Sequence, residues 1–267
     1  MTFPTQFVAK QQTVLLTPKL VVISANVKNP DIFSLAGSPS GATALTVQIN
    51  AGVEVTSLGV QTALDFGLSF ESNSTFVLNI LAAGLVLGHG GQGGAGTTCI
   101  DNGDGTSSCG SAAPGGNGGH AIQADRAITI DNLGEIRGGG GGGGGGGCAA
   151  NSLGANGWGG GGGGGVGSDP GLGGTGPATA GDGTAGNSVR PVGTPGVGGS
   201  GVSFGGNGAG GGDWAVAGSK GTTPSGPGGT EECITTGRNG GDPGAAVLLS
   251  AGTTTFVTTG TISGSVS

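Results

Sequence analysis

Three stretches of the chain share one pattern of alternating positions. Each stretch begins with a strand-like segment in which the shared pattern lies at every second position. This segment is followed directly by the motif Gly-x-Val/Ile-x-Gly. The three copies lie at residues 78–88, 128–138 and 254–264. Period-two alternation is typical of a strand with one buried face. The repeat therefore predicts three related β-strands in one framework.

Short aliphatic lead-ins precede the copies of this repeat. Residues 118–122 and 240–247 lead into the second and third copies, and residues 63–64 are the nearest equivalent before the first. The stretch 45–55 adds strands of the same alternating kind. The first two copies continue directly into glycine-rich sequence. We therefore expect a small β framework from which long glycine-rich excursions leave and to which they return.

Glycine is concentrated in the middle of the chain. Of 70 glycines, six lie in residues 1–87, 60 in residues 88–243 and four in residues 244–267. The usual interpretation of such a segment is a flexible linker. A structureless loop of this length is improbable within an ordered protein, so we expect the centre to be ordered.

Order in this centre must come from backbone hydrogen bonds, because few apolar side chains are available there. Each glycine loses about 0.5–1 kcal/mol more backbone freedom than alanine on folding, and glycine is a poor helix former. The polyproline II conformation directs N–H and C=O groups outward. Without Cβ atoms, such helices can pack closely and bond to each other. The unbroken runs 138–147 and 159–165 are the best candidates.

These patterns predict an all-β framework with a polyglycine II helix bundle and little or no α-helix. We expect an N-terminal attachment segment at 1–44 and a β framework with the first glycine-rich excursion at 45–137. A bundle with loops follows at 138–243, and C-terminal strands at 244–267 complete the framework.

Charge excludes some classes of partner. The formal net charge is -7, with eight Lys and Arg and no basic stripe, so nucleic-acid binding is not expected. No signal peptide is visible, and no run of 18 apolar residues predicts membrane insertion. Release by cell lysis would allow such a protein to act outside the cell.

The layout resembles the glycine-rich distal domains of phage tail fibres and tail-tip proteins. More distantly, it resembles the tail-fibre tip adhesins of T-even-type phages, in which glycine motifs form a polyglycine II sandwich. The resemblance covers residues 45–264. It rests on VQINAGVEVTS at 47–57, QTALDFG at 61–67, STFVLNILAAGLVLGHGGQGGAG at 74–96 and GGHAIQADRAITIDNLGEIRGGGGGGGGGG at 118–147.

This resemblance implies a virion adhesin at a tail tip or fibre, made in the host cytoplasm. Its partners would be a bacterial surface receptor, either an outer-membrane protein or a polysaccharide, and other tail or fibre proteins that hold the N-terminal segment. Phage tips are often homotrimers, although no coiled-coil heptads in this sequence support that state. Two alternatives are a structural virion protein without receptor contact and an ice-binding polyglycine protein.

Candidate receptor-binding residues lie in the islands between glycine runs, because binding residues often sit on loops held by a rigid scaffold. Two islands, 148–158 and 213–238, carry the only two tryptophans. Tryptophan is common in binding hot spots, but each could instead cap the apolar end of the bundle. The candidates are Asn151, Asn156, Trp158, Asp213, Trp214, Lys220 and Arg238.

Four cysteines allow three disulfide pairings. We expect Cys99–Cys109 to close a hairpin and Cys148–Cys233 to tie two loops. The sequence CIDNGDG at 99–105 favours tight turns and lacks the spacing of a calcium loop. Zinc is disfavoured because no CxxC occurs.

Nothing in the sequence predicts catalysis. His89 and His120 are isolated, and no Ser/His/Asp or Cys/His spacing forms a catalytic unit. Matches to GxGxxG are expected by chance in this composition and lack the strand–helix context. We therefore expect no enzyme, no cofactor and no metal site.

Overall fold

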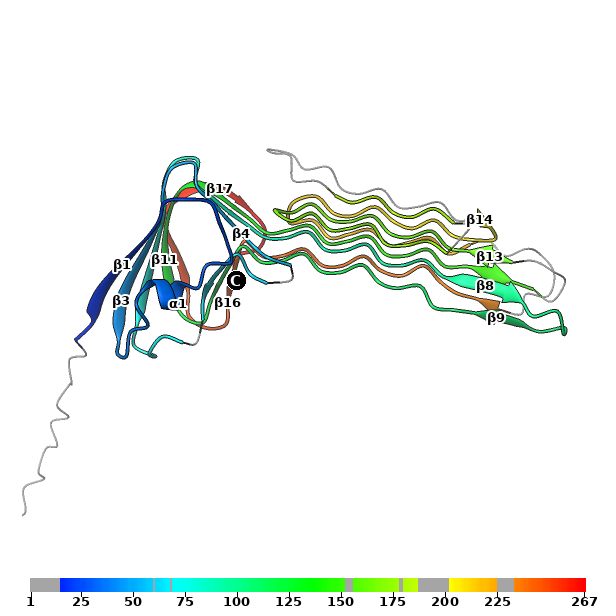
Figure 1. Ribbon diagram of the computed structural model, residues 1–267, viewed down its shortest axis with the longest axis horizontal. Helices are drawn as coiled ribbons and strands as arrows, with labels where there is room; N and C mark the ends of the chain where they lie inside the picture. The colour runs from blue at the N-terminus through cyan, green and yellow to red at the C-terminus, as the bar shows by residue number, and fades with distance from the viewer. Residues whose placement is uncertain are drawn as a thin grey trace, which may run out of the picture.

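A computed structural model describes residues 15–59, 61–67, 69–151, 156–177, 180–186, 202–224 and 233–267. Figure 1 shows two parts: a β framework that contains the C-terminus, and a long bundle of extended segments that projects from it. In the described residues, the one helix is α1 (Ile32–Leu35), four residues long. The expectation of a mostly β protein with almost no helix is confirmed.

The framework is made of parallel strands. Its first sheet has the order β1-β3-β6-β11-β7-β4-β2, with β17 also paired to β11, and its second has the order β16-β10-β5. The strands are β1 (Thr17–Ile23), β2 (Val27–Lys28), β3 (Thr43–Ile49), β4 (Glu54–Thr56), β5 (Leu64–Phe66), β6 (Thr75–Ile80), β7 (Leu85–Leu87), β10 (Ile122–Ala124), β11 (Ile128–Arg137), β16 (Val247–Leu249) and β17 (Thr254–Ser263).

Strand register reveals a stacked, three-sided coil. The first half of β11 pairs with β6 and its second half with β7, while β10 pairs with both β5 and β16. Successive turns of the coil are therefore β3-β4-β5, then β6-β7-β10, then the two halves of β11 with β16. The glycine-rich excursions 88–121 and 138–246 leave the coil after the second side and rejoin it at the third.

The lead-ins and the ends of the repeat align as the sequence predicts. Ile122 is the register partner of both Leu64 and Val247, and Ile136 is the partner of both Val86 and Ile262. Equivalent positions before and after the glycine-rich segments are therefore register partners in the same sheets.

The start of the first copy is shifted from the predicted alignment. The spacing pairs Leu78 with Ile128, but the structure pairs Leu78 with Ile130. The turn between β6 and β7 holds four residues, 81–84, whereas only residues 133–134 lie between the two paired parts of β11. The longer turn moves the strand before it by two residues, which keeps the same face buried.

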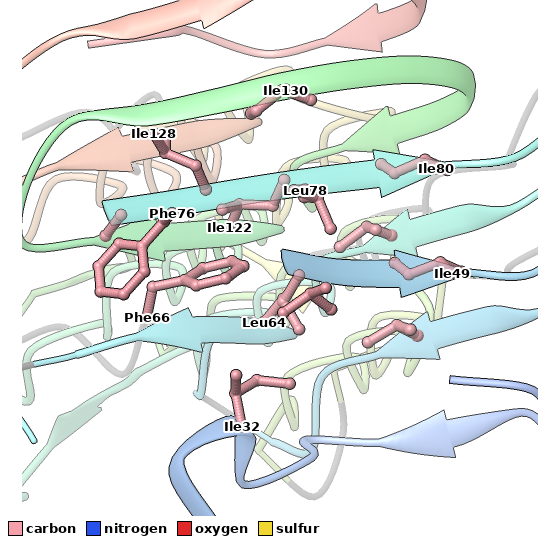
Figure 2. Packing of buried hydrophobic residues seen from close by; sticks show 14 of the residues in the cluster. Ile32, Ile49, Leu64, Phe66, Phe76, Leu78, Ile80, Ile122, Ile128 and Ile130 are labelled. Carbon is pink, nitrogen blue, oxygen red and sulfur yellow. The ribbon is translucent and has the colours of Figure 1, made fainter. Parts of the chain in front are cut away.

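Alternating apolar side chains fill the coil. In β3 the burial alternates without interruption, and Val47 and Ile49 are fully buried. Figure 2 shows side chains from β3, β5, β6, β10 and β11 meeting in the interior. The ring of Phe76 lies 5.3 Å from those of both Phe66 and Phe70, in tilted and edge-on contacts that favour aromatic packing.

The short helix α1 covers one end of this core. Asp31 caps it by accepting a hydrogen bond from the backbone N–H of Ser34 at 3.0 Å, and Ile32 turns inward to become 1% exposed. No helix in the described part of the chain is long and apolar enough to cross a membrane.

The glycine run 138–147 lies in the middle of the bundle, and all ten residues are buried. Its N–H groups donate to three neighbouring segments in rotation, so that every third residue faces the same neighbour. The donations run from Gly139, Gly142 and Gly145 to the carbonyls of Gly119, Gly116 and Ala113; from Gly140, Gly143 and Gly146 to those of Val166, Gly163 and Gly160; and from Gly141, Gly144 and Gly147 to those of Val216, Ser219 and Thr222.

Three further segments donate N–H groups to the carbonyls of the same run. These donors are Gly91 and Gly94; Gly206, Ala209 and Gly212; and Arg238, Gly241 and Gly244. The central run is thus surrounded by six hydrogen-bonded neighbours, and its buried backbone groups have partners despite the absence of side chains.

Close approach explains why these positions are glycine. A Cβ atom added at any residue of 138–147 would lie less than 3.0 Å from a backbone oxygen of a neighbouring segment. Real Cβ atoms essentially never approach that closely. The packing of the bundle therefore requires glycine along the entire central run.

Candidate functional site

Short antiparallel strands gather at the end of the bundle far from the framework (Figure 1). β8 pairs with β9 and with β13, β13 pairs with β14, and β12 pairs with β15. We call this end the tip. Its strands are β8 (Thr98–Asp101), β9 (Ser107–Cys109), β12 (Ala149–Ala150), β13 (Gly157–Trp158), β14 (Val202–Ser203) and β15 (Cys233–Ile234).

The loop between β8 and β9 is an exposed turn that satisfies its own polar groups. The carboxylate of Asp101 accepts from the N–H of Gly103 at 2.9 Å, and that of Asp104 accepts from the N–H of Thr106 at 3.0 Å. The hydrogen bonds from the Thr106 hydroxyl and N–H lower the pKa of Asp104. Gly103 and Gly105 have φ of +75° and +84°. These features match the predicted turn.

The island 148–158 reaches the tip. Trp158 lies in β13, half-buried, opposite Thr98 and Val202. The side-chain oxygen of Asn156 accepts from the N–H of Asp101 at 2.6 Å, which ties this island to the hairpin. Asn151 is 5% exposed at the start of the loop. Residues 152–155 lie outside the described residues.

Apolar exposure at the tip was not predicted from the sequence. Ile100 in β8 and Ile234 in β15 expose 41% and 43% of their surface. Their neighbours Cys99 and Cys233 point toward the buried side, so strand alternation places the two isoleucines outward. Each isoleucine directly follows a cysteine that points inward. If Cys99 and Cys233 are taken as inward positions of a strand, alternation in the sequence predicts that Ile100 and Ile234 are exposed.

Lys220 and Arg238 come together on the side of the bundle. They line a shallow hollow of about 240 Å³, together with Pro114, Thr236, Gly237 and Asn239. The Arg238 side chain is held there by donating from Nε to the carbonyl of Ala112 at 3.1 Å. The residues 225–232 of the same predicted island lie outside the described residues.

Asp213 and Trp214 lie beside the framework, at the end of the bundle opposite to the tip. Trp214 is 6% exposed and packs with Leu85, Leu87 and Val166. The Arg137 guanidinium lies 5.8 Å from its ring centroid. The structure therefore separates this pair from the other five candidates, and the packing of Trp214 agrees with the alternative in which tryptophan caps an apolar end of the bundle.

The four cysteines meet at the base of the tip loops. The sulfur of Cys99 contacts those of Cys109 and Cys148, and the sulfur of Cys109 also contacts that of Cys233. The sulfurs of Cys99 and Cys109, which the sequence predicts to pair in a disulfide, are in contact. Among the described residues, no bond joins Cys148 to Cys233, the other half of the expected pairing.

A second hollow lies near the framework. It measures about 450 Å³ and is lined in part by His89, Gln92, Asn117, Asp169 and Leu172. Burial lowers the pKa of His89, and the nearby Asp169 carboxylate opposes that shift. Four of its ten lining residues are glycine, and its ionisable side chains are those of His89 and Asp169.

Residues 19–267 match the family model described as phage tail fibre adhesin Gp38. The chain belongs to this adhesin family. The expected resemblance to phage tail fibre adhesins is thereby confirmed, and so is the expected function of an adhesin that binds a host cell rather than an enzyme.

A solved structure has the same fold as the adhesin. It is the crystal structure of the gp37–gp38 adhesin tip complex of the long tail fibre of bacteriophage S16. The two chains are 22% identical with a TM-score of 0.54, and the alignment covers 94% of this chain and 82% of the other. No curated protein matches the sequence.

Proposed function

We propose that the adhesin forms the receptor-binding end of a phage long tail fibre, with the tip loops touching the host cell and the bundle acting as a rigid arm. One observation carries the proposal: the exposed hairpin 102–106 and the strands around Trp158 lie at the end of the arm farthest from the framework. A tip at the end of an arm is the part of an adhesin that reaches a cell surface first.

We propose that the segments of the bundle are polyglycine II helices. The support is the threefold rotation of donors along 138–147, since this conformation has three residues per turn and directs its N–H and C=O groups outward. A strand would alternate between two directions instead. Crystal diffraction of the protein would test the assignment through a rise of about 3.1 Å per residue along these segments.

The framework is the proposed attachment side. The solved relative is a complex of gp37 with gp38, and we propose by analogy that a fibre protein holds the segment 1–44 of this adhesin. In that segment, the edge strand β1 exposes Leu20 at 64% and Val22 at 47%. Exposed apolar side chains on an edge strand favour a partner that covers them. Residues 1–14 lie outside the described residues.

The proposed receptor contacts are the candidates at or toward the tip whose side chains are not buried: Asn156, Trp158, Lys220 and Arg238. Asn151, which is 5% exposed, is left out for the same reason as Trp214. Trp158 offers an aromatic surface, and Lys220 with Arg238 offers positive charge beside a hollow. The burial of Trp214 favours a packing role instead, so that Asp213 and Trp214 are left out of the proposed contact surface.

Adsorption of phage carrying altered adhesins tests this surface. We expect Trp158→Ala and the double variant Lys220→Ala/Arg238→Ala to weaken binding of the purified protein to host cells, by about 30-fold where a residue is a hot spot worth about 2 kcal/mol. The matched control is Thr255→Ala, an exposed position in the framework, which should bind as the parent does. Unchanged binding by folded variants of every tip position would contradict the proposal.

A further inference from the structure

Four chain segments converge where the bundle becomes the tip, and each brings one cysteine. Cys99 lies in β8, Cys109 ends β9, Cys148 follows the central glycine run and Cys233 begins β15. Cys99 and Cys148 are fully buried, and the other two are partly buried against them. The sulfurs thus form one closed cluster at the roots of the loops.

The contacts within this cluster restrict the possible pairing. Three sulfur contacts are present, Cys99–Cys109, Cys99–Cys148 and Cys109–Cys233. One sulfur can belong to only one disulfide. The only way to use all four cysteines through these contacts is to omit Cys99–Cys109.

Backbone separation supports the same choice. The Cα atoms are 5.7 Å apart in Cys99–Cys148 and 6.1 Å apart in Cys109–Cys233, within the usual disulfide range of about 4.4–6.8 Å. The Cα atoms of Cys99 and Cys109 are 4.1 Å apart, because the two residues are direct partners in the hairpin. That separation lies below the usual range.

We propose that the adhesin carries two crossed disulfides, Cys99–Cys148 and Cys109–Cys233, which clamp the roots of the tip loops. Both ends of the hairpin 100–108 are then fixed, each to a different neighbouring segment. A Cys99–Cys109 bond would only close the hairpin on itself. The crossed pairing instead fixes the positions of separate loops relative to each other.

The side chain of Thr235 contacts both cysteines of one proposed bond. The hydroxyl oxygen of Thr235 accepts from the backbone N–H of Cys148 at 3.1 Å and lies 3.5 Å from its sulfur. The same hydroxyl lies 3.9 Å from the sulfur of Cys99. Thr235 therefore holds the segment after β15 against both cysteines of one proposed bond.

Formation of each bond requires a two-electron oxidant, which we take to be a small-molecule disulfide in an oxidising medium outside the cell. A protein thiolate attacks that disulfide and displaces one small thiol; the partner thiolate then attacks the mixed disulfide and displaces the second. Two protein thiols lose two protons and two electrons, and one small disulfide becomes two small thiols.

Peptide mapping of the unreduced, alkylated protein decides the pairing. Trypsin releases residues 29–126, 138–220 and 221–238 as separate peptides, which contain Cys99 with Cys109, Cys148, and Cys233 respectively. The crossed pairing joins all three peptides into one species. The alternative Cys99–Cys109 with Cys148–Cys233 leaves 29–126 unlinked and joins only the other two.

A second protease separates the two cysteines of the hairpin. Cleavage before Asp101 and Asp104 divides Cys99 from Cys109. We then expect two linked pairs, one holding Cys99 with Cys148 and the other Cys109 with Cys233. Linkage of Cys99 to Cys233, or of Cys99 to Cys109, would overturn the proposal.

Counting the free thiols distinguishes disulfides from the alternative in which the cysteines bind a metal ion as thiolates. Three of the sulfurs lie within 4.8 Å of one another, a spacing that thiolate ligands of zinc also allow. We expect no cysteine to react with iodoacetamide in denaturant without reductant. Four reactive thiols with one equivalent of bound zinc in the native protein would refute the disulfides.

The role of the clamp rests on the proposed function of the tip, and its test is separate from the mapping. The double variants Cys99→Ser/Cys148→Ser and Cys109→Ser/Cys233→Ser each retain one proposed bond. We expect each to bind host cells at least tenfold more weakly than the parent while retaining the unfolding transition of the framework. If mapping shows the crossed bonds but binding is unchanged, the clamp role fails and the pairing stands.

Discussion

The framework and the bundle differ in how their buried backbone groups are hydrogen-bonded and in what fills the space between segments. In the framework, strands bond to two neighbours and leave alternate side chains for the core, so that Leu64, Ile122 and Val247 stack at equivalent positions. Burial of such side chains stabilises a fold by about 25 cal/mol for each Å² of apolar surface. In the bundle, the run 138–147 has no side chains and bonds to six neighbours.

The same chain passes from one arrangement to the other without a break. β11 ends at Arg137, and the glycine run begins at the next residue. The N–H of Gly88 donates to the carbonyl of Arg137, so that the register of the framework continues into the first bonds of the bundle. The strand pairing in the framework thus determines which glycine segments start side by side. The hydrogen bonds of the bundle keep the same segments side by side toward the tip.

The largest effect should follow a side chain placed in the centre of the bundle. Gly142→Val puts a branched side chain where a Cβ would already collide with the carbonyl of Gln92. We expect the loss of at least about 4 kcal/mol of stability and failure of the bundle to assemble. Thermal unfolding followed by circular dichroism measures it.

A matched control separates this collision from the general cost of replacing glycine. Gly41 lies in the framework with no atom within 4 Å of an added Cβ. Gly41→Val, which introduces the same side chain, should leave the midpoint of unfolding nearly unchanged. Equal behaviour of the two variants would show that the bundle tolerates side chains and would remove the distinction between the two regions.

The next effect is expected in the core of the framework. Leu78→Ala removes a fully buried side chain from the central turn of the coil, which should cost about 2–5 kcal/mol. Chemical denaturation gives the value. Because the excursions leave and return through this coil, we expect framework and bundle to unfold together; two separate transitions would indicate that the bundle is stable alone.

A smaller effect is expected at the junction of the two regions. Trp214→Leu retains an apolar side chain against Leu85 and Leu87 but removes the ring that Arg137 contacts. A desolvated cation–π contact is worth about 2 kcal/mol, so the loss of stability should be close to that value. Adsorption should remain unchanged, and weakened adsorption by a stably folded variant would return Trp214 to the receptor surface.

Much of the fold could be predicted because it follows from the spacing of apolar residues and glycines along the sequence. Alternation located the strands, and the glycine runs located the segments without side chains. The lead-in Ala121-Ile122 aligned with its counterparts because the coil repeats one inward position on each turn. The two extra residues in the turn 81–84 shifted the first copy, and only strand pairing reveals such a shift.

The site was harder to predict, because proximity in sequence does not indicate which end of the bundle a loop occupies. Asp213 and Lys220 are seven residues apart, yet one lies at the framework end and the other begins to approach the tip. Between 88 and 177, where all residues but 152–155 are described, successive passes along the bundle run in opposite directions, so neighbouring islands there lie at opposite ends. The pairing of the cysteines was ambiguous for a related reason, since Cys148 and Cys109 arrive at the tip on different passes.

The smallest effect is a dependence on pH at the boundary of the two regions. Burial lowers the pKa of His89 and of His120, and Nδ1 of His120 accepts from the N–H of Ala245 at 2.8 Å. The unfolded chain therefore takes up protons before the folded one as pH falls. The stability that these two neutral imidazoles contribute should be fully present above about pH 6.5. It should decrease as the pH falls toward their lowered pKa values in the folded protein.

Thermal unfolding at pH 7.5 and 5.5 tests this expectation. We expect a lower midpoint at pH 5.5, and a smaller difference for His120→Asn, which cannot be protonated in this range. A midpoint that rises on acidification would show that these imidazoles are charged in the folded protein.

The direction of the hydrogen bonds in the bundle has a mechanical consequence. The bonds join segments that lie side by side along the arm, as from Gly142 to Gly116 and from Gly143 to Gly163. A force that pulls the tip away from the framework would load many such bonds in shear at the same time, instead of opening them one after another. An adhesin built in this way can withstand tension while its phage is anchored to a moving cell.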